Sequence, residues 1–423
     1  NWHFAEDDLA YLRTLKAQNG HELFSEEFLD YLRNLRFTCD VDAIPEGTPV
    51  FTHEPLLRIT GPILQCQLLE STLLNIINFQ TLVATKASRV CRAAKGDAVL
   101  EFGLRRAQGP DGALSASRAA YIGGCTATSN VLAGKKFGIP ISGTHSHSWV
   151  TAFPDEKTAF SAWAEVMPHN CSLLVDTYNT IDGVKHAIET GKELRAQGSK
   201  LLGIRLDSGD MAELSIQARR MLDDAGFTDT NIIASNSLDE YVIQLFKESH
   251  SAINVWGVGT HLVTAYDHPA LDGVYKLTAL RDKNGAWDYK LKLSEQNIKT
   301  SNPGIHQVRR FSRDGKPLMD CIYDVTLGIS ETHPQMIAPG SSNEPTQPDD
   351  FDSAVDLLEP IMRHGQLVCD TRLIHEIRAD SLKQVENFLQ TYQDAIYPVG
   401  LENQLEQMKN NLIADALKKN KRE

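Results

Sequence analysis

The sequence lacks several features that mark whole classes of protein. Its 423 residues contain no run of about 18 apolar residues, and no secretory hydrophobic segment opens the chain, so we expect neither a membrane span nor export. The seven cysteines are scattered, and no two of them stand in Cys-x-x-Cys or beside histidines at zinc-finger spacing. We therefore expect reduced thiols in a cytoplasmic protein, where they serve as small core residues.

Positive charge is also in deficit. The chain has 42 Lys and Arg against 55 Asp and Glu, which gives a formal net charge of −13. Such a surface excludes bulk binding to nucleic acid or to an anionic membrane, and an anionic substrate would need a local cluster of arginines. The hydrophobic fraction of 42% is that of a folded protein, and the length suggests two or three domains.

The pattern along the chain divides it into three parts, 1–95, 96–270 and 271–423. The first part is predicted to hold amphipathic helices over 1–45, an edge strand or hairpin over 48–60 and a long helix over 65–95, which has no internal glycine or proline before residue 96. The chain begins at Asn1 instead of methionine, so we expect that natural sequence precedes it.

The middle part repeats one unit six times. A short apolar run ends in a polar or glycine-rich cluster, and a helical segment follows, which indicates βα units and a parallel sheet. The six predicted strands are 99–102, 139–141, 172–175, 201–204, 231–234 and 253–256. In the last part, alternating segments separated by Asp-Gly and Asn-Gly turns predict antiparallel strands. These are 274–280, 288–293, 305–311 and 318–326, and a helix over 380–394 and a charged C-terminal helix follow them.

Polar clusters follow the predicted parallel strands, where α/β barrels and open α/β sheets place their active sites. The first cluster puts Arg105 and Arg106 just after a strand and before a glycine-rich turn into a helix near Ser115. Two guanidinium groups beside a helix start suit a phosphate or carboxylate ligand. Alternatively, these arginines pair with a structural acid such as Glu101.

Two further clusters follow later strands. Asp207 and Asp210 flank a Ser-Gly turn after Arg205, and their carboxylates could hold ribose hydroxyls or the waters of Mg²⁺. Equally, Asp207 could pair with Arg205, with the turn merely capping the next helix. The Gly257-Val-Gly-Thr260 turn offers backbone N–H groups and a hydroxyl to a phosphate, although any tight turn could use such glycines.

Two histidines, His145 and His147, follow the predicted strand at 139–141. They could be metal ligands of a barrel metallohydrolase, which would need further ligands at later strand ends. His169 precedes its strand, so only Asp176 and Asp207 could serve. Alternatively, one histidine accepts a phosphate beside the Gly-Thr turn while the other faces solvent.

Ten sequence motifs, in this order, resemble those of the nicotinate phosphoribosyltransferases, a type II phosphoribosyltransferase family. The motifs are LLNIINFQTLVATKASR, EFGLRRAQGPDG, SRAAYIGG, SNVLAGK, GTHSHSWV, LLVDTY, GIRLDSGD, SNSLDE, GVGT and KLSEQNIKTSNPG. Each motif alone has modest specificity for the family. Ten motifs in the same order cover most of the chain and together are highly specific.

The resemblance implies a fold and a reaction. The fold is a seven-stranded, incomplete α/β barrel joined to an α+β domain built from both chain ends, in a homodimer whose active sites lie at the subunit interface. The reaction joins nicotinate to phosphoribosyl pyrophosphate and releases pyrophosphate, in the salvage route to NAD. Mg²⁺ serves as cofactor and ATP as co-substrate, with ATP hydrolysis coupled through a phosphohistidine.

Carried over motif by motif, the resemblance makes His147 of Gly-Thr-x-x-His the phosphate acceptor. Thr144 of the same motif and Arg205 of Gly-Ile-Arg-Leu-Asp match nicotinate contacts. His145 occupies a position that varies within the family, so no role is carried over to it. The hypothesis of a two-histidine metal site is weakened accordingly.

The phosphoribosyl side of the site rests on three motifs. Thr260 matches a phosphoribosyl pyrophosphate contact, and Arg105 and Asp207 lie in motifs that face the phosphoribosyl group. The candidates for this substrate are therefore Arg105, Gly257, Gly259 and Thr260, with Asp207 as a catalytic residue. No direct metal ligand is assigned, and Asp207 and Asp210 are candidates for outer-shell contacts to Mg²⁺.

One feature of the family is missing from this sequence. The family opens with a Tyr-x-x-Thr-Met segment whose tyrosine stacks on the pyridine ring across the dimer, and the present sequence starts beyond it. A catalytically silent binding homologue is therefore an alternative, as is the metallohydrolase. Within the family, nicotinamide or quinolinate could replace nicotinate, but the motifs fit the nicotinate branch best.

Overall fold

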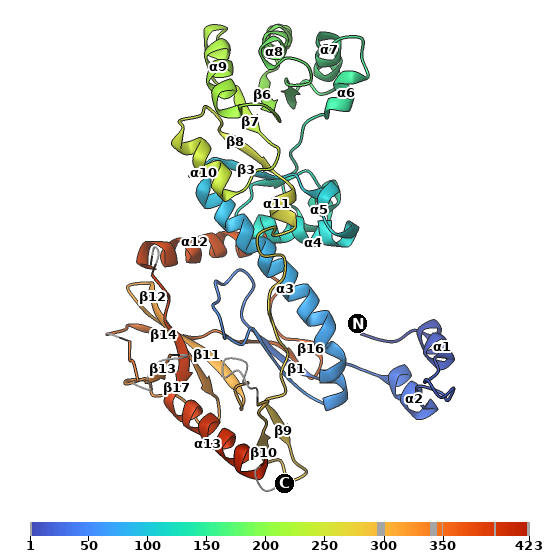
Figure 1. The fold of residues 1–423 in the computed structure, drawn as a ribbon, viewed down its shortest axis with the longest axis vertical. Helices are drawn as coiled ribbons and strands as arrows, with labels where there is room; N and C mark the ends of the chain where they lie inside the picture. The colour runs from blue at the N-terminus through green and yellow to red at the C-terminus, as the bar shows by residue number, and fades with distance from the viewer. Residues whose placement is uncertain (1, 294–300, 339–344, 349, 393–394, 421–423) are drawn as a thin grey trace. The chain divides into compact units, whose positions relative to one another are not determined.

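The computed structural model describes residues 2–293, 301–338, 345–348, 350–392 and 395–420. The chain forms two compact units. The first comprises Asn1–Leu74, Val274–Thr371 and Lys383–Glu423, and the second comprises Asn75–Gly273 and Arg372–Leu382. Two helices, α3 (Ile63–Ala93) and α12 (Ile374–Tyr392), contribute residues to both units (Figure 1).

The second unit contains a curled parallel sheet that forms half of a barrel. Its strand order is β4-β3-β8-β7-β6-β5, and every neighbouring pair runs parallel. The strands are β3 (Ala98–Glu101), β4 (Ala127–Thr128), β5 (Cys171–Leu174), β6 (Leu201–Leu206), β7 (Asn231–Ala234) and β8 (Val255–Val258). The predicted fold class, an incomplete α/β barrel joined to an α+β domain, is confirmed, but the described sheet has six strands instead of the predicted seven.

Helices follow the strands along the chain, as the repeated unit predicts (Figure 1). They are the 3-10 turn η1 (Leu104–Arg106), α4 (Gly109–Ile122), α5 (Val131–Phe137), α6 (His147–Thr151), α7 (Glu156–Val166), α8 (Thr180–Ala196), α9 (Met211–Asp224), α10 (Glu240–Glu248) and α11 (Thr260–Val263). In five of them the side chain of the N-cap residue accepts the backbone N–H of the residue three positions later in the chain. These caps are Asn130, Asp155, Asn179, Asp210 and Asp239.

Burial explains why the short apolar runs become strands. All four residues of β5 are buried, because helices and neighbouring strands cover a parallel sheet on both faces. The core of the unit continues through the inner faces of the helices, with Phe160 of α7, Leu222 of α9 and Trp256 of β8 among its largest side chains.

The edges of the half-barrel differ from the prediction. The predicted strand at 139–141 forms no strand and makes a single parallel bridge, from Ile141 to Thr128. Pro140 explains this, because it has no N–H to donate to a ladder, although its carbonyl accepts the Thr128 N–H at 3.0 Å. The two-residue strand β4, which was not predicted from the sequence, pairs in parallel with β3.

The first unit contains antiparallel sheets. One has the order β16-β15-β1-β2, one β10-β9, and a five-stranded one β13-β17-β12-β11-β14, in which only the β12–β17 pair is parallel among the described pairs. The strands are β1 (Asp40–Ala43), β2 (Leu57–Thr60), β9 (Ala279–Arg281), β10 (Trp287–Tyr289), β11 (His306–Arg313), β12 (Lys316–Asp324), β13 (Met336–Ile337), β14 (Ser353–Asp356), β15 (Glu359–Arg363), β16 (Gln366–Leu367) and β17 (Val399–Glu402).

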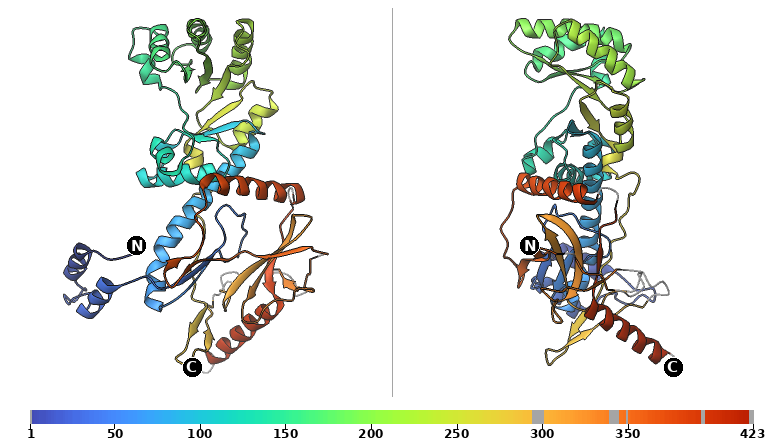
Figure 2. Two further views of the ribbon diagram at one scale, coloured as in Figure 1. Left: turned by 180° about the vertical axis from the view of Figure 1, so that it is seen from behind. Right: turned by 90° about the vertical axis from the view of Figure 1, so that its left-hand side faces the viewer.

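The N-terminal part of this unit differs from the prediction, because it is not helical throughout. Residues 1–45, predicted as helical, form α1 (Glu6–Thr14) and α2 (Glu26–Asn34) and then the strand β1, whose Asp-Val-Asp-Ala sequence has too few apolar residues to signal a strand. Of the predicted hairpin at 48–60, only β2 is a strand. The C-terminal helix α13 (Asn403–Asn420) follows β17 at the red end of the ribbon (Figure 2). Its Leu405 packs against residues of the five-stranded sheet.

The composition predicted that the chain has no membrane span and that its cysteines are reduced. No helix in the described ranges is long and apolar enough to cross a membrane. All seven cysteines are free thiols. Burial raises the pKa of the Cys39 and Cys171 thiols to about 12, so both stay protonated and unreactive at neutral pH.

A buried polar cluster ties the five-stranded sheet of the first unit together. Arg310 of β11 forms a two-pronged ion pair with Asp320 of β12, at 2.9 Å from Nε and 2.6 Å from Nη2, and the Tyr397 hydroxyl donates to the same carboxylate at 2.8 Å. Glu54, only 8% exposed, lies beside this carboxylate. Burial, with the charge of Asp320, raises the pKa of Glu54 to about 9.

This pKa shift predicts a pH-dependent stability. The folded-state pKa lies above the ordinary value of 4.5, so the stability that protonated Glu54 contributes is fully present below pH 4.5 and is lost as the pH rises towards about 9. The slope for one proton is at most about 1.4 kcal/mol per pH unit. Glu54→Gln keeps the shape without the charge, so its melting temperature should rise relative to that of the wild type between pH 5 and 8. Parallel melting profiles for the two proteins would contradict the assignment.

Candidate active site

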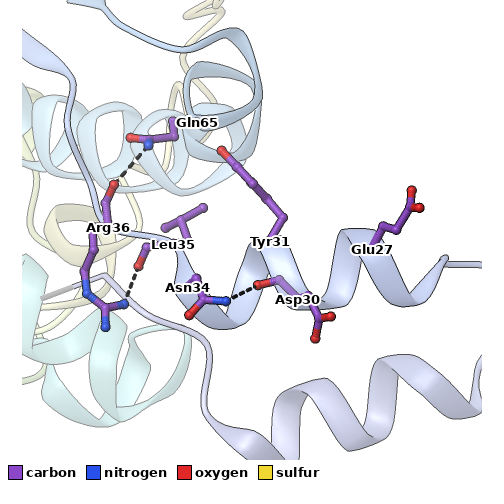
Figure 3. A pocket seen from close by; sticks show the side chains of 7 residues that line it. All are labelled: Glu27, Asp30, Tyr31, Asn34, Leu35, Arg36 and Gln65. Atoms are coloured by element: carbon purple, nitrogen blue, oxygen red, sulfur yellow. Dashed lines mark hydrogen bonds between the residues drawn. The ribbon is translucent and has the colours of Figure 1, made fainter.

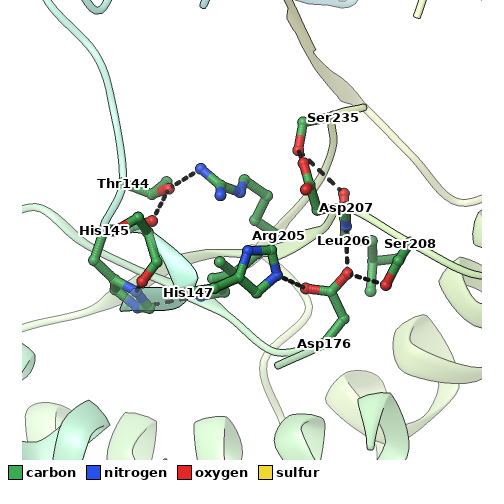
Figure 4. Close-up of polar contacts among 11 residues, drawn as sticks. Thr144, His145, His147, Asp176, Arg205, Leu206, Asp207, Ser208 and Ser235 are labelled. Atoms are coloured by element: carbon green, nitrogen blue, oxygen red, sulfur yellow. Dashed lines mark hydrogen bonds and ion pairs between the residues drawn. The ribbon is translucent and has the colours of Figure 1, made fainter. Parts of the chain in front are cut away.

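The carboxyl ends of the parallel strands bring distant polar side chains together at one edge of the half-barrel (Figure 4). Asp176 follows β5, Asp207 follows β6 and Ser235 follows β7, while Thr144 and His147 come from the segment after the Ile141 bridge. Parallel strands all end at the same edge, so their following residues meet although they are far apart in sequence.

His147 and Asp176 form the first contact of the site. The Nε2 atom of His147 lies 3.2 Å from Oδ1 of Asp176, whose side chain is 1% exposed, whereas the histidine ring is 42% exposed. The other carboxylate oxygen of Asp176 accepts the backbone N–H of Asp207 at 2.8 Å and the Ser208 hydroxyl at 2.6 Å. A carboxylate facing Nε2 fixes the proton there, which leaves the lone pair of a neutral ring on Nδ1.

Arg205 forms the second contact. Its Nη1 donates to the Thr144 hydroxyl, which itself donates to the His145 carbonyl at 3.0 Å (Figure 4). Its Nε is buried and has no hydrogen-bond partner. Burial lowers the pKa of Arg205, and the positive charge of Arg105 acts in the same direction, but a guanidinium stays charged at neutral pH. Arg205 is thus a partly buried cation whose Nε has no hydrogen-bond partner.

One alternative from the sequence was that Arg205 pairs with Asp207. The structure shows other partners for both side chains. Asp207 Oδ1 accepts the Ser235 hydroxyl, and no ion pair between Arg205 and Asp207 occurs among the described side chains. The capping alternative holds for Asp210, whose Oδ1 accepts the Glu213 N–H of α9 at 3.2 Å. One oxygen of each aspartate is therefore engaged in bracing its turn.

The alternative that Glu101 pairs with the two arginines is wrong. Glu101 is 1% exposed, and its carboxylate accepts hydrogen bonds from the Gly103 N–H, from Ser117 at 2.8 Å and from Thr128 at 2.6 Å. This carboxylate thereby joins β3, α4 and β4. Arg105 and Arg106 are exposed, and within the described chain neither has an acidic partner. Their charges remain available to an anion at this edge.

The Gly257-Val-Gly-Thr260 turn lies next to the end of β3, because β8 pairs with β3 in parallel register. Gly257 has to be a glycine, since a Cβ there would come within 2.7 Å of the Phe102 ring. Thr260 is exposed at the first position of the short helix α11. The turn therefore presents a hydroxyl near the arginines that follow β3.

His145 is buried, contrary to the alternative that one of the two histidines faces solvent. Its Nε2 accepts the Leu174 N–H at 3.2 Å, and its Nδ1 lies 3.3 Å from the Ser146 carbonyl. Both ring nitrogens are thus engaged with backbone groups, and within the described residues no three metal-binding side chains cluster. The two-histidine metal site has no support in this geometry.

Part of the site was not predicted from the sequence. Asp176 was considered only as a possible metal ligand, and no role was assigned to Ser208 or Ser235. One feature of the sequence could have indicated Asp176: like Asp207, it comes just after a short apolar run that forms a buried strand. Its pairing with His147, which is 29 residues away, depends on the curl of the sheet.

A surface hollow of about 500 Å³ lies elsewhere, in the first unit beside α2 and α3 (Figure 3). It is lined by Glu27, Asp30, Tyr31, Asn34, Leu35, Arg36 and Gln65. Several of its polar atoms already brace the backbone, since Gln65 donates to the Arg36 carbonyl at 3.0 Å and Asn34 to the Asp30 carbonyl at 2.9 Å. It contains none of the predicted site residues.

The fold and the site place the chain among α/β-barrel proteins that act at the carboxyl ends of their strands. Family descriptions match along almost the whole sequence: the nicotinate phosphoribosyltransferase N-terminal domain over 1–78, the nicotinate phosphoribosyltransferase family over 98–302 and the nicotinate phosphoribosyltransferase C-terminal domain over 305–409. The chain belongs to the nicotinate phosphoribosyltransferase family.

Individual relatives agree with this assignment. The chain is similar to the nicotinate phosphoribosyltransferase of Bacillus subtilis, with 48% identity over 332 residues, 71% of this chain and 67% of that protein. It is 35% identical to the Dictyostelium discoideum enzyme over 99% of this chain and 80% of the relative. The chain spans about two thirds of the length of the bacterial relatives it matches. The crystal structure of human nicotinic acid phosphoribosyltransferase superposes with a TM-score of 0.83 at 28% identity, covering 97% of this chain and 89% of that one.

Proposed function

We propose that the protein joins nicotinate to phosphoribosyl pyrophosphate, giving nicotinate mononucleotide and pyrophosphate, and couples this transfer to ATP hydrolysis in NAD salvage. The observation that carries the proposal is Arg205, a partly buried cation that donates to Thr144 and has an unpaired buried Nε donor, at the same strand edge as the His147–Asp176 pair. The names of the relatives support the reaction. As in the family, the working unit would be a homodimer.

In this proposal the pyridine nitrogen of nicotinate attacks the anomeric carbon of the ribose. The N–C bond forms as the C–O bond to pyrophosphate breaks, and the leaving group takes the electron pair. Arg205 binds the carboxylate of nicotinate and orients the ring, which needs no protein base because its nitrogen already has a lone pair. Arg105, the Gly257–Gly259 backbone and Thr260 stabilise the phosphates.

Asp207 and Asp210 fit an outer-shell role towards Mg²⁺ that enters with the pyrophosphate. Each has one oxygen braced, by Ser235 and by the Glu213 N–H respectively, which leaves the second oxygen of each carboxylate for a metal-bound water. When bound, Mg²⁺ would neutralise charge on the leaving group.

His147 is proposed to accept the γ-phosphate of ATP on Nδ1. The P–O bond to ADP breaks as the N–P bond forms, and water later releases the phosphate. Asp176 holds the proton on Nε2 and stabilises the positive ring that forms during transfer. The phosphate would add negative charge beside the substrate and could order the neighbouring loops.

The phosphohistidine is testable by labelling. Incubation with ATP labelled at the γ position should give a protein-bound label that is stable in base and labile in acid. His147→Ala should abolish this label, and His169→Ala, which alters an exposed histidine near the opposite end of β5, should leave it intact. A full label on the His147→Ala protein would refute the assignment.

Arg205 is expected to set the preference for the acid over the amide. Truncating one side of a buried charge pair costs about 2–5 kcal/mol, so Arg205→Ala should lower kcat/KM for nicotinate roughly 30-fold or more. The weak activity towards nicotinamide should change little. Arg205→Lys is the matched control, because it keeps the charge and loses the planar fork. An unchanged acid-to-amide ratio in a stably folded Arg205→Ala protein would contradict the carboxylate contact.

Thr260 is expected to act on phosphoribosyl pyrophosphate. Thr260→Val removes a hydroxyl that would donate to a phosphate, a bond worth about 1.5–3 kcal/mol, or roughly 10- to 150-fold in affinity. Nicotinate binding should weaken much less. Thr85→Val, which alters an exposed threonine of α3, serves as the control. Equal weakening for both substrates would argue against a phosphate contact at Thr260.

A further inference from the structure

The half-barrel is open between the 141–147 segment and the edge strand β5. A closed barrel would join these two segments by backbone hydrogen bonds, but the sheet order ends with β4 on one side and β5 on the other. The Leu174 N–H of β5 faces this gap. Its acceptor is a side chain, since it donates to Nε2 of His145 at 3.2 Å.

A second histidine makes an equivalent connection two residues further along both segments. His147 contacts Asp176 at 3.2 Å, and the two partners are 29 residues apart in this pair, as in the His145–Leu174 pair. The same offset in both pairs means that the two segments advance in the same direction across the gap. One histidine side chain links them at each of the two positions.

The ring of His145 is fixed in place by burial and by contacts with two aromatic rings. It is 5% exposed, and it lies edge-on to Trp163 with the ring centroids 5.2 Å apart and 6.0 Å from Phe160. Because Leu174 donates to Nε2, the proton of the neutral ring is on Nδ1, where it reaches the Ser146 carbonyl. Burial lowers the pKa of His145 to about 4, so the ring stays neutral at physiological pH.

We propose that His145 is the positioning residue of this site: it fixes the segment that carries Thr144 and His147 to the open edge of β5. The Thr144 hydroxyl, which holds Arg205, itself donates to the His145 carbonyl at 3.0 Å. One buried ring thus sets the place of the carboxylate-binding arginine and of the phosphate-accepting histidine. The kinetic consequence rests on the proposed function, whereas the contact itself can be tested without any substrate.

Three variants separate positioning from simple packing. His145→Phe keeps a ring against Trp163 and removes the acceptor, leaving the Leu174 N–H unpaired. His145→Gln restores an acceptor at a similar reach. Ser215→Ala is the matched control in the same unit, because the fully buried Ser215 hydroxyl accepts the Ala252 N–H at 3.0 Å and is not part of the site.

The experiment measures histidine ¹⁵N resonances, melting temperature and steady-state kinetics on the whole 423-residue chain. In the wild type, His145 should be neutral with its proton on Nδ1 between pH 6 and 8. His145→Phe should shift the His147 resonances and lower kcat by about tenfold or more, equivalent to about 1.4 kcal/mol. His145→Gln should recover kcat to within about threefold of the wild type. Ser215→Ala should lose melting temperature while its kcat and its His147 resonances stay at wild-type values.

Several results would overturn the inference. A proton on Nε2 of His145 in the wild type would do so without any variant. So would unchanged His147 resonances in His145→Phe, or equal changes in Ser215→Ala. If the wild-type chain catalyses no transfer, the proposed function fails, and the resonances still decide whether His145 positions His147.

Discussion

The carboxylate of Asp176 is the constraint on which the rest of the site depends. It accepts hydrogen bonds from the turn after β6, through the Asp207 N–H and the Ser208 hydroxyl, and it contacts His147 from the far side of the gap. A buried carboxylate is costly unless its oxygens are satisfied. Because these groups come from separate segments, the burial of one charge holds the ends of β5 and β6 and the start of α6 in a fixed arrangement.

An open barrel makes this arrangement necessary. A closed barrel satisfies its edge strands through its backbone, whereas β5 ends the sheet here and leaves donors that side chains have to meet. One short segment therefore both satisfies this edge and leaves a histidine accessible, with His145 buried and His147 half exposed.

Most of the fold could be predicted from the sequence, because buried parallel strands are short apolar runs that end in polar turns. Five of the six predicted strands of the middle part are present, although their ends shift by a residue or two. The failures have local causes. Pro140 lacks the N–H that a strand at 139–141 would need, although its apolar neighbours suggested one. The strand β4 is too short to leave a periodic signal in the sequence. The strand β1 alternates aspartate with small apolar residues, so it does not look like a strand in the sequence.

The site was less predictable, because spacing along the chain says which residues follow strands but not which of them touch. Arg205 and Asp207 stand two apart on one strand end, which suggested a pair, yet Thr144 and Ser235 from other segments take their hydrogen bonds. This leaves Arg205 with a buried Nε that has no partner. An unpaired buried donor costs about 1–3 kcal/mol, and an acceptor that reached this Nε would remove that cost. Spacing along the chain could not predict this unpaired donor, because it depends on where Thr144 and Ser235 lie in the fold.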